Sequence, residues 1–271
     1  MNVVAGILCG GYGKRLRPLT NSIPKSLIEI KEGYTILERQ LFQLKYAGVK
    51  KAYLLAGYLH EKIEERIGND FMGLEIEYLI EDRPRGTLYA INQLLDRLSR
   101  DQLAIVMNGD IVTDVNLLEM ISSWVRGTVS VFVTPLVSPY GIVELSSDGR
   151  ISSFVEKPKL PYYINGGVYV IPRELKGYFE EHGEGDVERL VLPKLASDGL
   201  LRYYEEDVFW RSIDSHKDLE EVRREFRNRA DKPWGYEKIV VLTERYLVKT
   251  CLLYTSPSPR DLSTSRMPSS A

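Results

Sequence analysis

Residues 10–25, GGYGKRLRPLTNSIPK, combine a glycine-rich backbone with four cations, a combination suited to binding an anion. Gly10, Gly11 and Gly13 allow backbone N–H groups to approach an anion closely. Arg15 offers phosphate oxygens a planar fork of donors, and Lys25 offers a point charge. The stretch therefore predicts a polyphosphate site. The plainer alternative is a solvated turn.

Two common phosphate-binding loops are excluded by single residues. A Walker A loop needs a glycine five residues before the Gly13-Lys14 pair, where this chain has Leu8, and a Ser or Thr where it has Arg15. The dinucleotide fingerprint needs a third glycine after Gly11 and Gly13, and Leu16 stands there instead. Any phosphate site here belongs to another class.

The elements that must position this stretch follow a strand–helix rhythm. Buried-strand patterns at 3–9, 51–57, 74–80, 103–110 and 128–136 alternate with helical patterns at 35–48, 59–68, 87–98 and 115–127. This rhythm predicts an α/β fold with a mainly parallel sheet flanked by helices. In such sheets ligands bind beyond the carboxyl ends of the strands, which is where residues 10–25 lie.

The second half of the chain has a different pattern. A hairpin is expected around Asp148-Gly149, then a further strand at 164–172 and two helical segments.

Composition narrows the function classes. The 271 residues carry a net charge of −2, which points to neither nucleic acid nor a membrane surface as a partner. The two cysteines have no disulfide or zinc spacing, and the apolar start is typical of a strand rather than a signal peptide. These features favour a cytoplasmic protein.

Several motifs together resemble the sugar-1-phosphate nucleotidyltransferases, or nucleotide-sugar pyrophosphorylases. Residues 10–27 are similar to the pattern GGxGTRLxPLT followed by PK, with Lys14 in place of Thr. EDRPRGTLYAI (81–91) is similar to E-x-x-P-L-G-T-A, with Arg85 for Leu and Leu88 for Ala. NGD (108–110), FVEKP (154–158) and NGG (165–167) match further segments, and Asp214 is kept without the usual Gly-Thr-Pro. The resemblance covers residues 1 to about 229 and implies a Rossmann-like, mixed but mainly parallel sheet.

The resemblance implies an activity. A hexose 1-phosphate attacks the α-phosphate of a nucleoside triphosphate, pyrophosphate leaves, and Mg²⁺ is the cofactor. The mannose-1-phosphate guanylyltransferase type, with GTP and mannose 1-phosphate, is the best specific match. Glucose 1-phosphate with TTP, UTP or CTP, and a non-catalytic paralogue that binds nucleotide sugars, are the alternatives.

The resemblance also implies residue roles. Arg15, Lys25 and Asp110 are expected to be catalytic, and Asp110 and Asp214 to hold the metal. The expected nucleotide-binding residues are Gly10, Gly11, Gly13, Glu81, Gly86 and Thr87. The expected sugar-phosphate-binding residues are Gly141, Glu156, Lys157 and Asn165. Helix caps and turns are the plainer reading for Asp110, Asp214 and Thr87.

Residues 230–271 are expected to form two different segments. Residues 230–250 resemble the first strands of a mannose-6-phosphate isomerase type cupin, but no histidine follows His216, so a truncated domain with unpaired strands is expected. Residues 251–271 are rich in Ser and Pro, and back-translate onto a sequencing-library adapter. They are expected to be a disordered, non-native tail. A homo-oligomer is left open.

Overall fold

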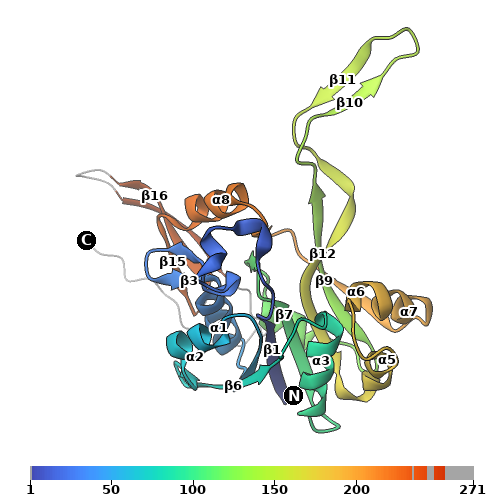
Figure 1. Ribbon diagram of the computed structural model, residues 1–271. Helices are drawn as coiled ribbons and strands as arrows, with labels where there is room; N and C mark the ends of the chain where they lie inside the picture. Colours follow the sequence, from blue (N-terminus) through green and yellow to red (C-terminus); the bar gives the residue numbers. More distant parts are fainter. Residues whose placement is uncertain (1, 234, 243–246, 254–271) are drawn as a thin grey trace, which may run out of the picture.

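The computed structural model describes residues 2–233, 235–242 and 247–253. These residues form a central eight-stranded sheet in the order β13-β9-β12-β7-β1-β4-β6-β5 (Figure 1). Its strands are β1 (Val3–Leu8), β4 (Lys51–Ala56), β5 (Asp70–Phe71), β6 (Leu74–Ile80), β7 (Leu103–Asn108), β9 (Val129–Val137), β12 (Lys159–Pro172) and β13 (Leu201–Glu205). Strands β7, β1, β4 and β6 run parallel, whereas β12 is antiparallel to both of its neighbours. The predicted mixed, mainly parallel sheet is confirmed.

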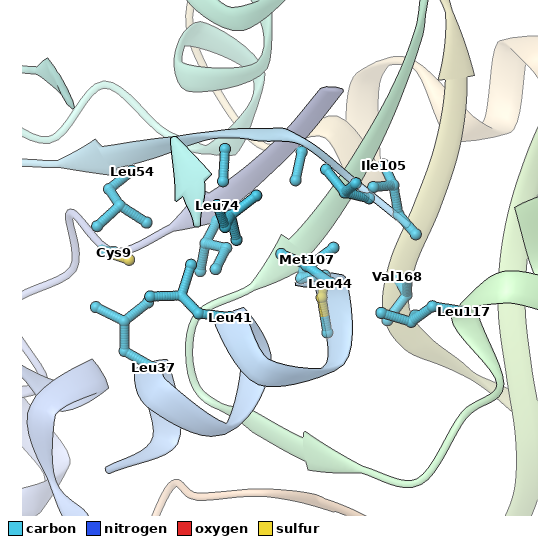
Figure 2. Packing of buried hydrophobic residues seen from close by; sticks show 14 of the residues in the cluster. Cys9, Leu37, Leu41, Leu44, Leu54, Leu74, Ile105, Met107, Leu117 and Val168 are labelled. Atoms are coloured by element: carbon cyan, nitrogen blue, oxygen red, sulfur yellow. The ribbon is translucent and has the colours of Figure 1, made fainter. Parts of the chain in front are cut away.

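Helices cover both faces of this sheet because alternate strand residues point to opposite sides. One face packs on α1 (Ile36–Tyr46), α2 (His60–Ile67) and α4 (Leu117–Ser122). Figure 2 shows Leu44 of α1 beneath Met107 of β7, and Leu37 and Leu41 of the same helix below Cys9 and Leu74. The other face packs on α3 (Thr87–Asp96), α5 (Lys176–Glu180), α6 (Val187–Leu190) and α7 (Leu192–Ser197).

The helix expected at 115–127 is shorter than predicted. Asn116 caps α4 by accepting from the Glu119 amide, and the helix ends at Ser122. The Trp124 indole donates to the Thr128 carbonyl, and the Thr128 hydroxyl donates to the Val125 carbonyl. These bonds close a turn where the sequence pattern suggested another helical turn.

Short elements connect the sheet to the loop at residues 10–25. The loop contains three 3₁₀ turns, Lys14–Leu16, Leu19–Asn21 and Lys25–Leu27, and leads into the small pair β2 (Glu29–Lys31) and β3 (Tyr34–Thr35). Strand β8 (Ile111–Thr113), which follows β7, pairs with β14 (Trp210–Ser212). Helix α8 (His216–Phe226) then packs its apolar side against Leu16, Ile28 and Ile30.

The expected hairpin projects from the body (Figure 1). Its strands are β10 (Ile142–Leu145) and β11 (Ile151–Val155), with Asp148 and Gly149 at the turn. It continues the long strands β9 and β12, which are hydrogen-bonded to each other.

A three-stranded antiparallel sheet follows α8. It consists of β15 (Arg229–Lys232), β16 (Gly235–Leu242) and β17 (Leu247–Leu253). The prediction of unpaired strands in this region is wrong, because β16 pairs with β15 on one side and β17 on the other. Cys251 to Leu253, assigned above to the irregular tail, belong to β17, and the rest of that expected tail lies outside the described residues. Within the described chain, no helix is long and apolar enough to cross a membrane.

Candidate active site

Two adjoining cavities lie at the carboxyl edge of the parallel strands. The larger, of about 250 Å³, is enclosed by the segments that follow β1, β6 and β7. Its lining residues are Leu8, Cys9, Gly10, Gly11, Lys25, Ser26, Leu55, Glu81, Pro84, Gly86, Thr87, Ala90, Asn108, Gly109 and Asp110. The smaller, of about 190 Å³, is lined by Gly11, Gly13, Lys14, Arg15, Leu16, Lys25, Asp110 and Asp214. Gly11, Lys25 and Asp110 line both, so the two cavities form one continuous site.

Lys25 lies at the junction of these cavities, between two carboxylates. Its Nζ donates to Asp110 Oδ2 at 2.7 Å and to Asp214 Oδ1 at 3.0 Å. Asp110 follows β7, and Asp214 follows β14 from the other half of the chain. The two segments are joined by the β8–β14 pairing and by the Ile213 amide, which donates to the Asp110 carbonyl at 2.9 Å. The fold therefore brings together three residues that are up to 189 positions apart.

The electrostatic surroundings keep Asp214 ionised. Partial burial raises the pKa of its carboxyl, but the hydrogen bond and charge of Lys25, the Ser212 hydroxyl and the Arg15 charge outweigh burial. The net result is a pKa below the ordinary aspartate value. Arg15 Nη1 lies 3.4 Å from Asp214 Oδ1, and its side chain is 77% exposed. Arg15 thus contacts Asp214 while keeping most of its donors available to a ligand.

The donor chemistry at this junction fits Mg²⁺. Asp110 and Asp214 offer hard carboxylate oxygens that converge on one cation, here the Lys25 ammonium. No cluster of three or more His, Cys, Asp or Glu side chains suited to a metal occurs in the described part of the chain. Mg²⁺ usually takes only one or two carboxylates and completes its shell with phosphate and water oxygens, so two aspartates suffice.

Glu81 also lines the larger cavity and lies directly after β6. Its Oε2 accepts from the Arg85 amide at 3.2 Å. Burial raises the pKa of this carboxyl, and the Arg85 hydrogen bond and charge only partly offset that effect. A β-carbon at Gly10 would lie 2.4 Å from Glu81 Oε1, so any other residue at position 10 would displace the Glu81 carboxylate from its place.

The other expected nucleotide residues also border the cavities. Gly86 and Thr87 line the larger cavity, where Thr87 begins α3, and Gly13 lines the smaller one. The Thr87 hydroxyl is engaged within the protein, because it accepts from the Val187 amide and donates to Glu188.

The expected sugar-phosphate residues are not brought to the cavities. Gly141, Glu156, Lys157 and Asn165 are absent from the lining of both. The first three flank the projecting hairpin, and Lys157 has a left-handed backbone with φ of 48°. Asn165 lies on β12, where its amide donates to the Tyr169 hydroxyl at 2.8 Å. Their sugar-binding role stays a prediction.

Sequence reasoning missed other polar residues of the site. Ser26 and Asn108 both line the larger cavity, and the Ser26 hydroxyl interacts with the Cys9 thiol. Among the described residues, Asn108 Oδ1 is buried without a hydrogen-bond partner, which is costly unless a ligand or water supplies a donor. The only sequence signal of the two residues is that they adjoin Lys25 and the Gly-Asp pair. Lys14, which had no expected role, lines the smaller cavity, and its Nζ lies 5.4 Å from the centre of the Tyr12 ring.

Comparison with known proteins agrees with the family resemblance of the sequence motifs. The family described as "Nucleotidyl transferase" matches residues 4–229. The mannose-1-phosphate guanylyltransferase of Mycobacterium tuberculosis is 32% identical over 226 residues, which are 80% of this chain and 62% of that protein. The chain thus spans about three fifths of the length of the guanylyltransferases it matches. A probable glucose-1-phosphate cytidylyltransferase of Bacillus subtilis is 31% identical, covering 85% of this chain and 98% of that protein.

Solved structures are similar in fold. A putative glucose-1-phosphate thymidylyltransferase from Bacillus anthracis superposes with a TM-score of 0.69 at 21% identity, over 85% of this chain and 98% of that one. HddC from Yersinia pseudotuberculosis, in a structure complexed with GMP-PN, gives a TM-score of 0.66 at 25% identity, over 83% of this chain and 100% of that one. With the match over residues 4–229 and these relatives, the chain belongs to the sugar-1-phosphate nucleotidyltransferase family.

Proposed function

We propose that this protein transfers a nucleotidyl group from a nucleoside triphosphate to a hexose 1-phosphate, with GTP and mannose 1-phosphate as the preferred pair. The observation that carries the reaction class is the convergence of Asp110, Asp214 and Lys25 where the two cavities meet. An oxygen of the sugar phosphate attacks the α-phosphorus, the bond from that phosphorus to the bridging oxygen breaks, and pyrophosphate leaves. The attacking oxygen is already anionic, so the protein mainly positions charges.

Each charged residue then has a part in this reaction. Asp110 and Asp214 would hold Mg²⁺, which supplies positive charge to the phosphate oxygens when it is bound. Lys25 donates from Nζ to oxygens of the α-phosphate and the sugar phosphate. Arg15, which is mostly exposed beside Asp214, neutralises the leaving pyrophosphate. Gly10, Gly11 and Gly13 give the backbone room to approach the triphosphate.

Glu81 supports guanine as the base. The Watson–Crick edge of guanine presents two neighbouring donors, N1–H and N2–H, and an ionised carboxylate is an acceptor only. Uracil, cytosine and adenine each present an acceptor beside a donor, so one of their atoms would face a carboxylate oxygen without a proton. The relatives named as guanylyltransferases, and the GMP-PN complex of HddC, agree with this choice.

A panel of four triphosphates against three hexose 1-phosphates, with Mg²⁺ and detection of pyrophosphate, tests the proposal. We expect the highest kcat/KM for GTP with mannose 1-phosphate. A preference for CTP with glucose 1-phosphate, as in the name of the Bacillus subtilis relative, would reject the substrate pair but keep the reaction class. Nucleotide-sugar binding without pyrophosphate release would identify a non-catalytic paralogue.

Replacement of Lys25 tests the site itself. Lys25→Ala should lower kcat by at least about a hundredfold, because one preorganised charge contact in a transition state is worth about 2.7–4 kcal/mol. Lys62→Ala, which removes an exposed lysine on α2, is the matched control and should keep normal turnover. Near-normal turnover in a folded Lys25→Ala enzyme would reject the assignment.

A further inference from the structure

Glu188 of α6 joins the nucleotide side of the site to β12, although it lines neither cavity. Its Oε2 accepts from the Thr87 hydroxyl at 3.2 Å, and Thr87 borders the larger cavity. Its Oε1 accepts from the Tyr169 hydroxyl at 3.3 Å. Tyr169 in turn accepts from the amide of Asn165 at 2.8 Å, and Asn165 is the β12 residue expected to bind sugar.

The directions of these hydrogen bonds all converge on the carboxylate. The Val187 amide donates to Thr87 Oγ1 at 2.9 Å, which leaves the Thr87 proton to point at Glu188. On the other side, Asn165 Oδ1 accepts from the Gly167 amide at 2.9 Å, so Nδ2 is the atom that faces Tyr169. A carboxylate is the one side chain that accepts on both oxygens without donating. The arrangement therefore requires an acid at residue 188.

The same segment is fastened to the nucleotide loop by its backbone. The Gly185 amide donates to the Arg85 carbonyl at 2.8 Å, and the Leu88 amide donates to the Gly185 carbonyl at 2.9 Å. A β-carbon at Gly86 would lie 2.2 Å from the Gly185 carbonyl oxygen, so the two segments are in direct backbone contact. Any shift of the loop at 85–88 must therefore move Glu188.

The Tyr169 side of this chain is rigid. Tyr169 is 1% exposed, and burial, followed by the nearby Glu188 charge, raises the pKa of its hydroxyl. The hydroxyl therefore stays protonated, and a buried hydroxyl left without an acceptor is unfavourable. Tyr169 thus transmits a displacement of Glu188 to Asn165 rather than absorbing it.

We propose that Glu188 is a positioning residue that couples nucleotide binding to hexose 1-phosphate binding. A nucleotide that orders the loop at 85–88 fixes Thr87 and Glu188, and Tyr169 then holds the Asn165 amide in place for the sugar. The coupling rests on the proposed function, because it presumes that Asn165 contacts the hexose. It assigns a role to an acid that none of the sequence motifs singled out.

Calorimetry with two non-reacting ligands tests the coupling without turnover. The ligands are mannose 1-phosphate and α,β-methylene-GTP, whose bridging carbon replaces the oxygen of the bond that is cleaved, both in the presence of Mg²⁺. In the wild type, the GTP analogue should tighten mannose 1-phosphate binding about fivefold or more, the lower end of typical coupling. In Glu188→Gln and in Tyr169→Phe this ratio should fall to about one, and the double variant should be no different from either.

Controls separate coupling from a structural effect. Thr87→Ser keeps the hydroxyl and should keep the coupling ratio. Glu181→Gln changes an exposed acid that pairs with Lys194 and should also leave the coupling ratio unchanged. A ratio of one in the wild type, an unchanged ratio in both folded variants, or failure of the wild type to bind either ligand would overturn the proposal. Coupled binding without pyrophosphate release would instead reject the proposed reaction and leave the coupling intact.

Discussion

The carboxylate of Glu81 is the group in the larger cavity to which the proposed function assigns recognition of the base. It lies directly after β6, packs against Gly10, and accepts one backbone N–H, so its position is fixed before a base arrives. Its raised pKa means that protonation begins at a higher pH than for an ordinary glutamate. Guanine binding should therefore weaken as the pH falls through that raised pKa, because a protonated carboxyl no longer accepts two donors.

Glu81→Gln should change base selectivity more than stability. The glutamine keeps the volume but presents one donor and one acceptor, so kcat/KM for GTP should fall about 10- to 100-fold, in line with about 1.5–3 kcal/mol for hydrogen bonds to charged groups. Activity with UTP should rise relative to GTP, since uracil offers a donor beside an acceptor. Glu77→Gln, on the exposed side of the same strand, is the control. Equal losses for all four triphosphates would contradict a role for Glu81 in base choice.

At the level of elements, helix α1 supports the segment that carries Asp110. Gln40 is buried, and its Nε2 donates to the Asn108 carbonyl at 2.8 Å and to the Ile111 carbonyl at 3.0 Å. One side chain thus holds both ends of the Asn-Gly-Asp-Ile segment. The helix itself begins at a capping box, in which the Thr35 and Glu38 side chains each bind the other residue's backbone amide.

Gln40→Leu should therefore lower both stability and catalysis. Two buried carbonyls would lose a donor, at a cost of about 1–3 kcal/mol each, and Asp110 would lose its support. Gln43→Leu is a matched control, because Gln43 lies one turn along α1 and donates to the Thr113 carbonyl at 2.9 Å, beyond the Asp110 segment. Urea unfolding should show destabilisation in both variants, whereas kcat should fall clearly only in Gln40→Leu. Equal kcat values would show that Asp110 does not depend on α1.

The same elements show what the sequence could and could not predict. The strand–helix rhythm and the loop at 10–25 follow from local patterns, so the mainly parallel sheet and the position of that loop after its first strand could be predicted. The convergence of Asp110 and Asp214 on Lys25 depends on the β8–β14 pairing, which joins segments about a hundred residues apart, and only the family resemblance suggested it. Tertiary contacts that no local pattern encodes determine three other features. These are the direction of the hairpin, the pairing of β16 with β15 and β17, and the hydrogen bonds of Glu188. Glu156 and Lys157, which were expected to bind the sugar phosphate, flank this hairpin, and the direction of the hairpin could not be read from the sequence.

At the level of the whole molecule, a buried ion-pair cluster joins the nucleotidyltransferase domain to the three-stranded sheet. Arg229, at the start of β15, donates to Asp114 at 2.9 Å and to Asp231 at 3.0 Å. Arg39 of α1 contacts the same two aspartates, each at 3.0 Å. All four side chains are at most 5% exposed, and two positive charges balance two negative ones. The family match ends at residue 229, so this cluster lies at the junction.

Arg229→Met should destabilise the protein by about 3–5 kcal/mol, because the described contacts of the two buried carboxylates, Asp114 and Asp231, then include one cation, Arg39, besides the Tyr34 hydroxyl on Asp231. The guanidinium also stacks on Tyr236 of β16, 3.6 Å from the ring centre, so the three-stranded sheet should loosen together with the domain. Urea unfolding followed by Trp fluorescence measures the loss. Lys238→Met removes a partly exposed ion pair between β16 and Glu225 of α8, and should cost less than about 1 kcal/mol. A similarly small loss for Arg229→Met would mean that the nucleotidyltransferase domain and the three-stranded sheet are stable independently. If the cluster held them together, removal of one of its two cations would destabilise the protein by more than that.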